Sequence, residues 1–194
     1  MEFVNMLALS EEQLMQAARM LSDELPMGWA NADEAREEIR ERLLVASERY
    51  ITGVKRPQDE EENYFVAAMD GGEVIGWCGI LPSYGCNVYE LHPLVVRHDL
   101  QRQGVGAALV WQVEEEARRR GGLTLWLGAD DEVGDGETSL ANVDLYDDLP
   151  ERIRSFDPGT HQTAFYLKQG FKVVGVMPDA GGIGKPDIYM AKRL

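Results

Sequence analysis

The sequence predicts an α/β protein with one mixed, mostly antiparallel central sheet flanked by helices. Strand-like and helix-like segments alternate along the chain, which favours the α/β class. Gly71-Gly72 separates two β-rich segments, which is typical of an antiparallel hairpin. A chain of 194 residues suffices for one domain with a sizeable core, and neither a repeat nor a low-complexity linker divides it. We therefore expect a single domain over residues 1–194.

The first third of the chain combines an edge strand with two helices. The segment "EFVNMLAL" is strand-like, and Ser10 and Gln13 have the spacing of a capping box at the start of a first helix. A second helix is expected from about Asp33 to Tyr50, a segment rich in Glu, Arg and Leu.

The remaining elements follow the hairpin. The strand "NVYELHPLVV" leads to a helix over Gly104–Arg120, in which Glu114, Glu115 and Glu116 each precede an Arg by four residues, a spacing that stabilises helices. A short buried strand, a further helix and two strands complete the pattern: "GGLTLWLGA", residues 163–169, "FKVVGVM" and "DIYMAKRL". Trp77 and Trp126 are expected in the core.

Composition narrows the class of protein. No apolar run approaches the roughly 18 residues of a membrane span, and the N-terminal segment carries acids where a secretion signal carries bases. Cys78 and Cys86 lie in no CxxC or Cys/His pattern, so they predict no disulfide framework and no metal site. We expect a cytoplasmic protein with inert thiols.

The net charge of the chain limits the classes of binding partner. The chain has 34 acidic and 19 basic residues, a formal net charge of −15, which argues against nucleic acids and anionic membranes as partners. Residues 130–151 contain nine acids and no Lys or Arg. Two interpretations fit this acidic stretch: a solvated loop, or a surface that attracts a polycation.

The segment "QRQGVG" connects a predicted strand to a predicted helix. Gln101, Gly104 and Gly106 form a Q-x-x-G-x-G arrangement, in which glycine lets backbone N–H groups approach a ligand beside a helix N-terminus. This geometry suits a pyrophosphate, although a glycine turn that caps the helix fits the segment equally well.

The chain resembles the GNAT superfamily of acetyl-coenzyme A-dependent N-acetyltransferases in the order of its segments. That order is a strand, Q-x-x-G-x-G, a helix, a strand and "FYLKQGF". The segments "ELHPLVV", "LGADD" and "FYLKQGFKVVGV" are similar to the aminoglycoside 6'-N-acetyltransferases, in the group that includes the chromosomal enterococcal enzyme. The resemblance covers residues 64–192 and is loose over the first 60 residues.

The resemblance implies a fold, a reaction and a partner. It implies the GNAT fold, acetyl-coenzyme A as cosubstrate with no metal, and direct acetyl transfer in a ternary complex to the 6'-amine of aminoglycosides, an activity that confers antibiotic resistance. It also implies a homodimer. Tyr166 matches the superfamily tyrosine that lies near the thioester sulfur.

The residues around Pro93 have the chemistry that such a transfer needs. Glu90 can bind the substrate ammonium and accept its proton, and His92 projects from the same face of a regular strand. Pro93 favours a bulge or splay, which leaves the N–H of Leu94 free for the thioester oxygen. Without the resemblance, Glu90 is more typical of a solvent-facing residue, His92 of a packing histidine and Tyr166 of a half-buried helix residue.

The cofactor is expected to contact three groups of residues. The pantetheine arm would lie along the strand, the pyrophosphate on the glycine loop, and the thiol near Tyr166. The residues are Leu94, Val95, Val96, Gln101, Arg102, Gln103, Gly104, Val105, Gly106, Ala107 and Tyr166.

Carboxylates are the expected ligands of a cationic substrate. Together with Glu90, Asp130 and Asp131 would hold ammonium groups through charge-assisted hydrogen bonds. Asp187 is a further candidate, or a turn residue before the last strand. Two alternative functions stay open: acetylation of a polyamine or protein amine, and a coenzyme A-binding module without turnover.

Overall fold

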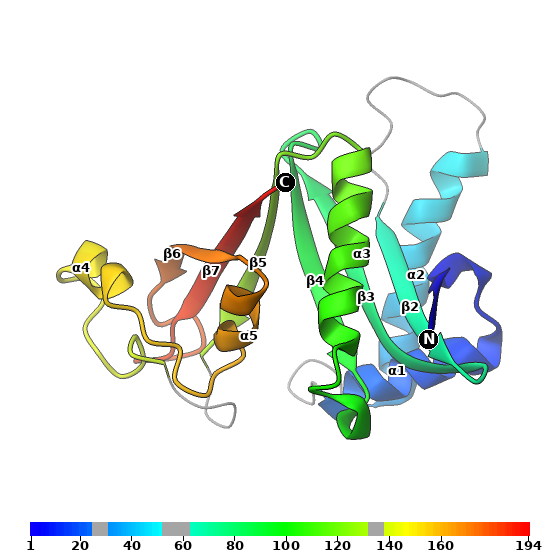
Figure 1. Ribbon diagram of the computed structural model, residues 1–194, viewed down its shortest axis with the longest axis horizontal. Helices are drawn as coiled ribbons and strands as arrows, with labels where there is room; N and C mark the ends of the chain where they lie inside the picture. The colour runs from blue at the N-terminus through cyan, green and yellow to red at the C-terminus, as the bar shows by residue number, and fades with distance from the viewer. Residues whose placement is uncertain (25–30, 52–62, 132–137) are drawn as a thin grey trace. The chain divides into compact units, whose positions relative to one another are not determined.

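The computed structural model describes residues 1–24, 31–51, 63–131 and 138–194, with the side chains of 44–51 left aside. These residues form two compact units, Met1–Leu123 with Leu194, and Thr124–Arg193 (Figure 1). Each unit is an antiparallel sheet with helices, so the α/β class and the mostly antiparallel pairing are confirmed. The single domain over residues 1–194 stays a prediction.

The first unit has a four-stranded antiparallel sheet. Gly71 and Gly72 form the predicted hairpin turn with φ of +58° and +88°, which glycine adopts without steric cost. The first strand lies at the edge, as predicted, and is followed by a short 3₁₀ helix. The strands are β1 (Glu2–Asn5), β2 (Tyr64–Asp70), β3 (Glu73–Ser83) and β4 (Val88–Val96).

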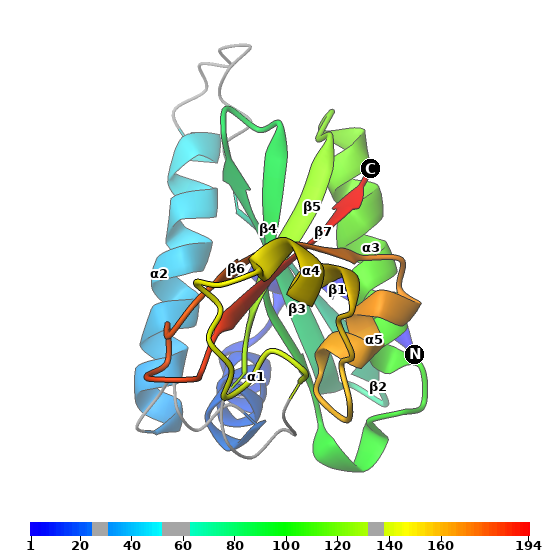
Figure 2. The ribbon, with the colours of Figure 1, turned by 90° about the vertical axis from the view of Figure 1, so that its left-hand side faces the viewer.

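Three helices cover the two faces of this sheet: α1 (Glu11–Glu24), α2 (Ala32–Ile51) and α3 (Val105–Arg119). Figures 1 and 2 show α1 and α2 on one face and α3 on the other. The capping box of α1 is confirmed, because Ser10 N–H donates to Gln13 Oε1 at 2.9 Å and Gln13 N–H donates to Ser10 Oγ at 3.3 Å. None of the helices in the described ranges is both long and apolar enough to cross a membrane.

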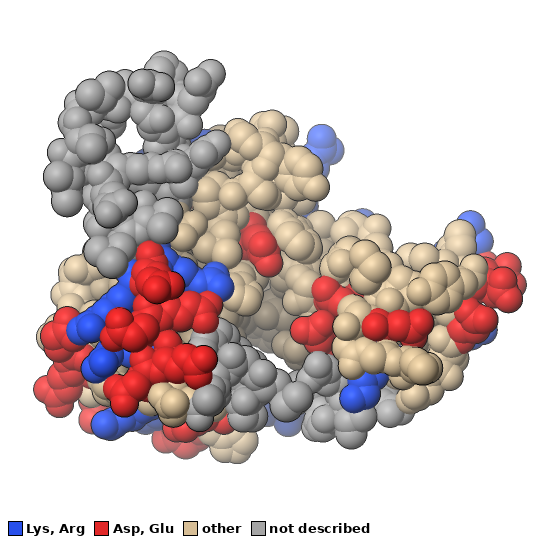
Figure 3. All heavy atoms as spheres, turned by 180° about the vertical axis from the view of Figure 1, so that it is seen from behind, with Lys and Arg blue, Asp and Glu red and all other residues tan. Residues whose placement is uncertain are grey.

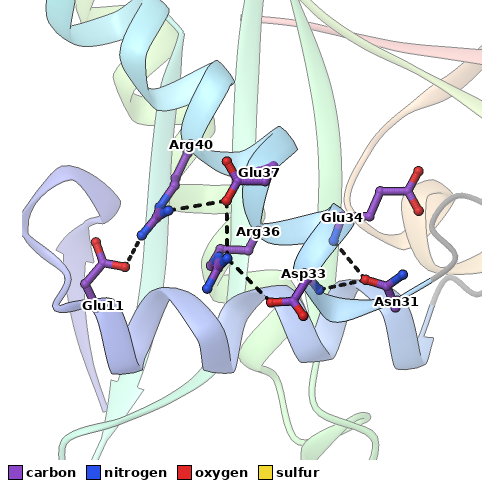
Figure 4. A network of polar contacts seen from close by, with 7 residues as sticks. All are labelled: Glu11, Asn31, Asp33, Glu34, Arg36, Glu37 and Arg40. Carbon is purple, nitrogen blue, oxygen red and sulfur yellow. Dashed lines mark hydrogen bonds and ion pairs between the residues drawn. The ribbon is translucent and has the colours of Figure 1, made fainter.

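Polar contacts fix where α2 begins and join it to α1 (Figure 4). Asn31 accepts hydrogen bonds from the backbone N–H groups of Asp33 and Glu34, each at 3.0 Å. Arg40 forms an ion pair with Glu11 of α1. Figure 3 shows interleaved acidic and basic side chains over α1 and α2, as expected for a solvated helix pair.

Apolar packing holds α1 and α2 on the sheet. Trp77 of β3 is 1% exposed, and its Nε1–H donates to the carbonyl of Ala17 in α1 at 3.1 Å. On the other face, Leu109 and Val105 of α3 lie against Gly76, where an added Cβ would be about 3 Å from Leu109. The prediction that Trp77 is a core residue is confirmed.

The predicted ion pairs of α3 form in a modified pattern. Glu114 pairs with Arg118 and Glu116 with Arg120 at the expected spacing of four residues. Arg118 also pairs with Glu115 at 2.6 Å, three residues away. The bases therefore gather at the C-terminus of the helix, as its dipole favours.

The second unit has a three-stranded antiparallel sheet in the order β5, β7, β6, with two short helices. Residues of β5 alternate between the core and the other face, so this strand is buried on one side only. Trp126 is half-buried and makes an edge contact with Tyr189, which corrects the expectation of a core tryptophan. The elements are β5 (Thr124–Asp130), α4 (Leu149–Arg154), α5 (Thr163–Lys168), β6 (Lys172–Met177) and β7 (Asp187–Arg193).

Trp77→Phe is expected to lower the free energy of unfolding by about 1–3 kcal/mol, because it leaves a cavity and removes the hydrogen bond to Ala17. Trp111, which is 56% exposed on α3, supplies the control, and Trp111→Phe should change stability by less than about 0.5 kcal/mol. Urea unfolding of both variants measures the difference. Equal stabilities would contradict this account of the core.

Candidate functional site

Strand β4 carries the first three candidate residues at half-buried positions. Glu90, His92 and Leu94 are half-buried, whereas the residues between them are buried in the core. Glu90 pairs with Leu81 of β3 and Leu94 pairs with Cys78, and these two β3 residues point to opposite faces of the sheet. The structure therefore places the three predicted residues on one strand, with Leu94 on the face opposite Glu90.

A bulge interrupts the pairing of β3 and β4 between Glu90 and Leu94. Cys78 pairs with Leu94 and Ile80 with Leu91, so two steps on β3 oppose three steps on β4. Gly79 lies at this point, where an added Cβ would be 2.6 Å from the carbonyl oxygen of His92. The irregularity expected from Pro93 is thus confirmed as a β-bulge.

Two charged residues of α2 act on this strand face. Arg42 donates to Glu38 Oε1 through Nε at 2.9 Å and through Nη2 at 2.5 Å. Burial raises the pKa of Glu90, and the guanidinium of Arg42 opposes that rise. Burial lowers the pKa of His92 and Arg42 lowers it further, whereas Glu38 acts in the opposite direction.

These opposing effects make Glu90 a more basic carboxylate than an exposed glutamate and favour a neutral His92. A half-buried carboxylate of raised pKa is a better proton acceptor at neutral pH than an ordinary one. Sequence reasoning missed Arg42 and Glu38, because their spacing of four residues is also typical of a solvated helix face.

The glycine loop ends at the N-terminus of α3. Gly104 is the N-cap with φ +90°, and no side chain caps the helix. No atom lies within 4 Å of the position that a Cβ of Gly104 would occupy, so the space in front of the loop is open. The backbone N–H groups of the first helical turn have no partner within the helix, so Val105, Gly106 and Ala107 can offer donors to an anion.

Side chains of the loop anchor it to the rest of the first unit. Gln101 donates through Nε2 to the carbonyl of Val96 at 3.1 Å and to Glu24 at 2.9 Å. Gln103 donates through Nε2 to the carbonyl of Asp99 at 3.0 Å. The backbone N–H of Gln101 donates to the carbonyl of His98 at 3.3 Å, so this amide closes a turn and is not a free donor at the predicted cradle.

In the second unit, two predicted carboxylates lie opposite each other on neighbouring strands. Asp130 ends β5 and pairs in register with Asp187, the first residue of β7. Gly128 makes room for them, because a Cβ there would be 2.9 Å from a carboxylate oxygen of Asp187. Both carboxylates, together with burial, raise the pKa of Tyr189.

Asp131 has a structural role beside this pair. Asp131 is 3% exposed. Its carboxylate accepts hydrogen bonds from the backbone N–H and the Oγ1 of Thr138, at 3.1 and 2.6 Å. Its carboxylate therefore joins the end of β5 to Thr138. Substrate binding by Asp131 is the least supported of the predicted carboxylate roles.

Tyr166 lies on α5 and is 7% exposed, with its ring in edge contact with Phe165 and Phe171. A buried histidine that sequence reasoning missed fixes this helix: His161 Nδ1 accepts from the backbone N–H of Thr163, and Nε2 lies 3.0 Å from the carbonyl of Asp130. His161 thus ties the helix that carries Tyr166 to the strand end that carries Asp130. No local sequence motif marks this contact.

The acidic stretch is an ordered segment where the structure describes it. Leu140 and Leu145 are buried, whereas Asp144, Asp147 and Asp148 are exposed. Figure 3 shows acidic side chains on this unit. Glu132, Asp135 and Glu137 lie outside the described residues. Both interpretations of the stretch remain compatible with this arrangement.

Residues 21–140 match the acetyltransferase (GNAT) family. The chain belongs to this family, which confirms the fold class and the resemblance inferred from "QRQGVG" and "FYLKQGF".

Among solved structures, the chain is 33% identical to an aminoglycoside 6'-N-acetyltransferase complexed with coenzyme A, over 100% of this chain and 97% of that chain, with a TM-score of 0.83. The aminoglycoside 6'-N-acetyltransferase from Enterococcus faecium is also 33% identical, with the same coverage and a TM-score of 0.81. An aminoglycoside 6'-acetyltransferase type Ii is 30% identical, again over 100% and 97% of the two chains, with a TM-score of 0.69. No curated protein matches the chain.

Gly79→Ala is expected to destabilise the protein by about 1–3 kcal/mol, because the new methyl group meets the Phe65 ring and the backbone of His92. Gly175→Ala on β6 is the matched control, since the nearest atom to its new Cβ is 3.4 Å away. Thermal unfolding and backbone amide shifts of Leu91 and Leu94 would report the effect. Wild-type stability and amide shifts in Gly79→Ala would contradict this prediction, because they would mean that the bulge accommodates the methyl group.

Proposed function

We propose that this protein transfers the acetyl group of acetyl-coenzyme A to an amine, with the 6'-amine of an aminoglycoside as the preferred acceptor. The observation that carries the proposal is the half-buried Glu90 on a bulged strand, followed within the same unit by a glycine loop and an uncapped helix N-terminus. The likeness to the aminoglycoside 6'-N-acetyltransferases at 30–33% identity supports the choice of acceptor.

In the proposed reaction Glu90 binds the acceptor ammonium and takes its proton, directly or through a water molecule. The neutral amine then attacks the thioester carbonyl in a ternary complex, and the C–S bond breaks as the amide forms. The backbone N–H of Leu94 stabilises the developing oxyanion, and Tyr166 donates a proton or a hydrogen bond to the departing thiolate. The neutral ring of His92 supports Glu90 from the same strand face.

The first unit has features that fit coenzyme A. The pyrophosphate would accept hydrogen bonds from backbone donors of Arg102 to Ala107, beside the positive end of the α3 dipole. The pantetheine arm would pair along Leu94, Val95 and Val96. The open space at Gly104 is consistent with a bulky anion at this point.

The second unit has features that fit a polycationic acceptor. Asp130 and Asp187 would bind substrate ammonium groups, and Asp131 would support them through its hydrogen bonds to Thr138. The net charge of −15 would accelerate encounter with a polycation at low salt. A linear polyamine or a protein amine is also cationic, and a panel of amine acceptors distinguishes these substrates.

The proposal also includes the oligomeric state and the cellular location of the protein. We infer a cytoplasmic homodimer, to which the C-terminal strands could contribute. A coenzyme A-binding module without turnover is the alternative from another class. Release of free thiol on addition of acetyl-coenzyme A and an aminoglycoside separates an enzyme from such a module.

Gly104→Asp is expected to weaken coenzyme A binding at least about tenfold, because it places a carboxylate beside the pyrophosphate. Gly104→Ala is the control for backbone strain, since any side chain at φ +90° is strained. Calorimetry on both folded variants separates charge from strain. Wild-type affinity in Gly104→Asp would rule out this placement of the pyrophosphate.

Glu90→Gln is expected to reduce acetyl transfer by about 100-fold near neutral pH, because the amide cannot accept the ammonium proton. The wild-type rate should fall as the pH falls through the raised pKa of Glu90, since the carboxylate is then protonated. Raising the pH should partly rescue the variant, because more of the acceptor amine is already neutral. The measurement is a pH–rate profile with one aminoglycoside and saturating acetyl-coenzyme A.

The control is Glu2→Gln, which alters an exposed glutamate of the edge strand β1. Coenzyme A affinity should stay unchanged in both variants, because Glu90 does not belong to the loop. Profiles of wild type and Glu90→Gln that agree within about threefold at every pH would make Glu90 a structural residue.

A further inference from the structure

On helix α2, the ion pair between Glu38 and Arg42 lies apart from the other ion pairs of the helix. Glu38 and Arg42 keep only 33% and 29% of their side-chain surfaces exposed. The neighbouring pairs of Arg36 with Asp33 and Glu37, and of Arg40 with Glu11, run along α2 or across to α1 (Figure 4). The Glu38–Arg42 pair is therefore set apart from the network that joins the two helices.

The core places this pair beside the candidate site. Ile39 and Leu43 of α2 are buried in the same apolar cluster against which Leu81 of β3 packs. Leu81 pairs in register with Glu90, and directly opposite residues of neighbouring strands project from one face. The face of β4 that carries Glu90 and His92 is thus the face that α2 covers. Asn63 also donates to the backbone carbonyl of Arg42, at 3.4 Å.

The charges of this pair act on both candidate residues. Arg42 favours the ionised form of Glu90 and the neutral form of His92, whereas Glu38 favours protonation of His92. Among the described residues, the positions of β3 that share this face near Glu90 are Gly79 and Leu81, and neither carries a charge. The charged groups that act on Glu90 and His92 from the described residues are therefore Arg42 and Glu38.

We propose that Arg42, held by Glu38 on the helix that covers this face of β4, is a positioning residue that supplies a fixed positive charge to Glu90 and His92 of the acetyl-transfer site. This proposal rests on the proposed function for its effect on the rate. Its physical basis is that burial alone would drive Glu90 towards its neutral form, which can neither bind an ammonium electrostatically nor accept its proton. A cation that is fixed by its own carboxylate counteracts burial without blocking the lone pairs of Glu90.

Arg42 takes no part in the covalent steps. The ammonium proton goes to Glu90, the acetyl group goes to the amine, and the guanidinium stays charged throughout. Loss of Arg42 should therefore change the pH at which the enzyme works more than the affinity of the glycine loop for coenzyme A.

The experiment titrates His92 by NMR and measures the pH dependence of kcat/KM in the full-length protein. In Arg42→Met we expect the pKa of His92 to rise by about 0.5–1 pH unit, and the acid limb of the rate profile to move to higher pH by a similar amount. In Glu38→Gln the pKa of His92 should fall. Arg42→Lys, which keeps the charge, should restore most of the wild-type profile.

Arg40→Met on the same helix is the matched control, because Arg40 pairs with Glu11 and Glu37 and should leave the titration of His92 unchanged. His92→Gln assigns the resonance among the three histidines. If Arg42→Met fails to fold, the downward shift in Glu38→Gln tests the same coupling.

An unchanged His92 titration in a folded Arg42→Met or Glu38→Gln variant would overturn the proposal, whatever the activity. An equal loss of rate at every pH would overturn it as well, since that result indicates only a structural role. Shifts of His92 in the expected directions, in a protein that transfers no acetyl group to any amine, would support the charge coupling and contradict the proposed function.

Discussion

The pairing of β3 with β4 is the constraint on which the candidate site depends. Because a strand alternates its side chains, one register places Tyr89 and Leu91 in the core and leaves Glu90 on the half-buried opposite face. The bulge opposite Gly79 inserts one residue between Leu91 and Leu94. A side chain larger than hydrogen at position 79 would clash with the backbone of His92. The packing of β3 and the geometry of the site are therefore coupled.

Burial and charge act against each other at this strand. A catalytic carboxylate needs some burial to raise its pKa, yet too much burial would leave it protonated. Arg42 limits the effect of burial on Glu90, and Glu38 limits the effect of Arg42 on His92. The side chains that balance these two effects come from a helix about 50 positions earlier in the chain, so the site depends on the packing of α2 through Ile39 and Leu43.

Local patterns explain which features the sequence could predict. The capping box of Ser10 and Gln13, the Gly71-Gly72 turn and the bulge near Pro93 each depend on residues within a few positions, so their residue types suffice to find them. Glu38–Arg42 and Glu114–Arg118 have the same spacing and the same helical geometry. Which of them faces a functional strand is decided by tertiary packing, and the same holds for Asp131, whose carboxylate binds Thr138, and for His161.

The Asp130–Asp187 pair places two carboxylates directly opposite each other on neighbouring strands. Like charges directly opposite each other on neighbouring strands are destabilising, and both carboxylates also disfavour ionisation of Tyr189. Gly128, which packs no side chain of its own, leaves the room that the Asp187 carboxylate occupies. Under the proposed function, a bound ammonium group would reduce the repulsion between the two carboxylates, and this reduction would add to the affinity for a cation. Neutralising either carboxylate should therefore raise the free energy of unfolding of the unliganded protein. The reason is that a charge which binds a cation strongly is destabilising while the cation is absent.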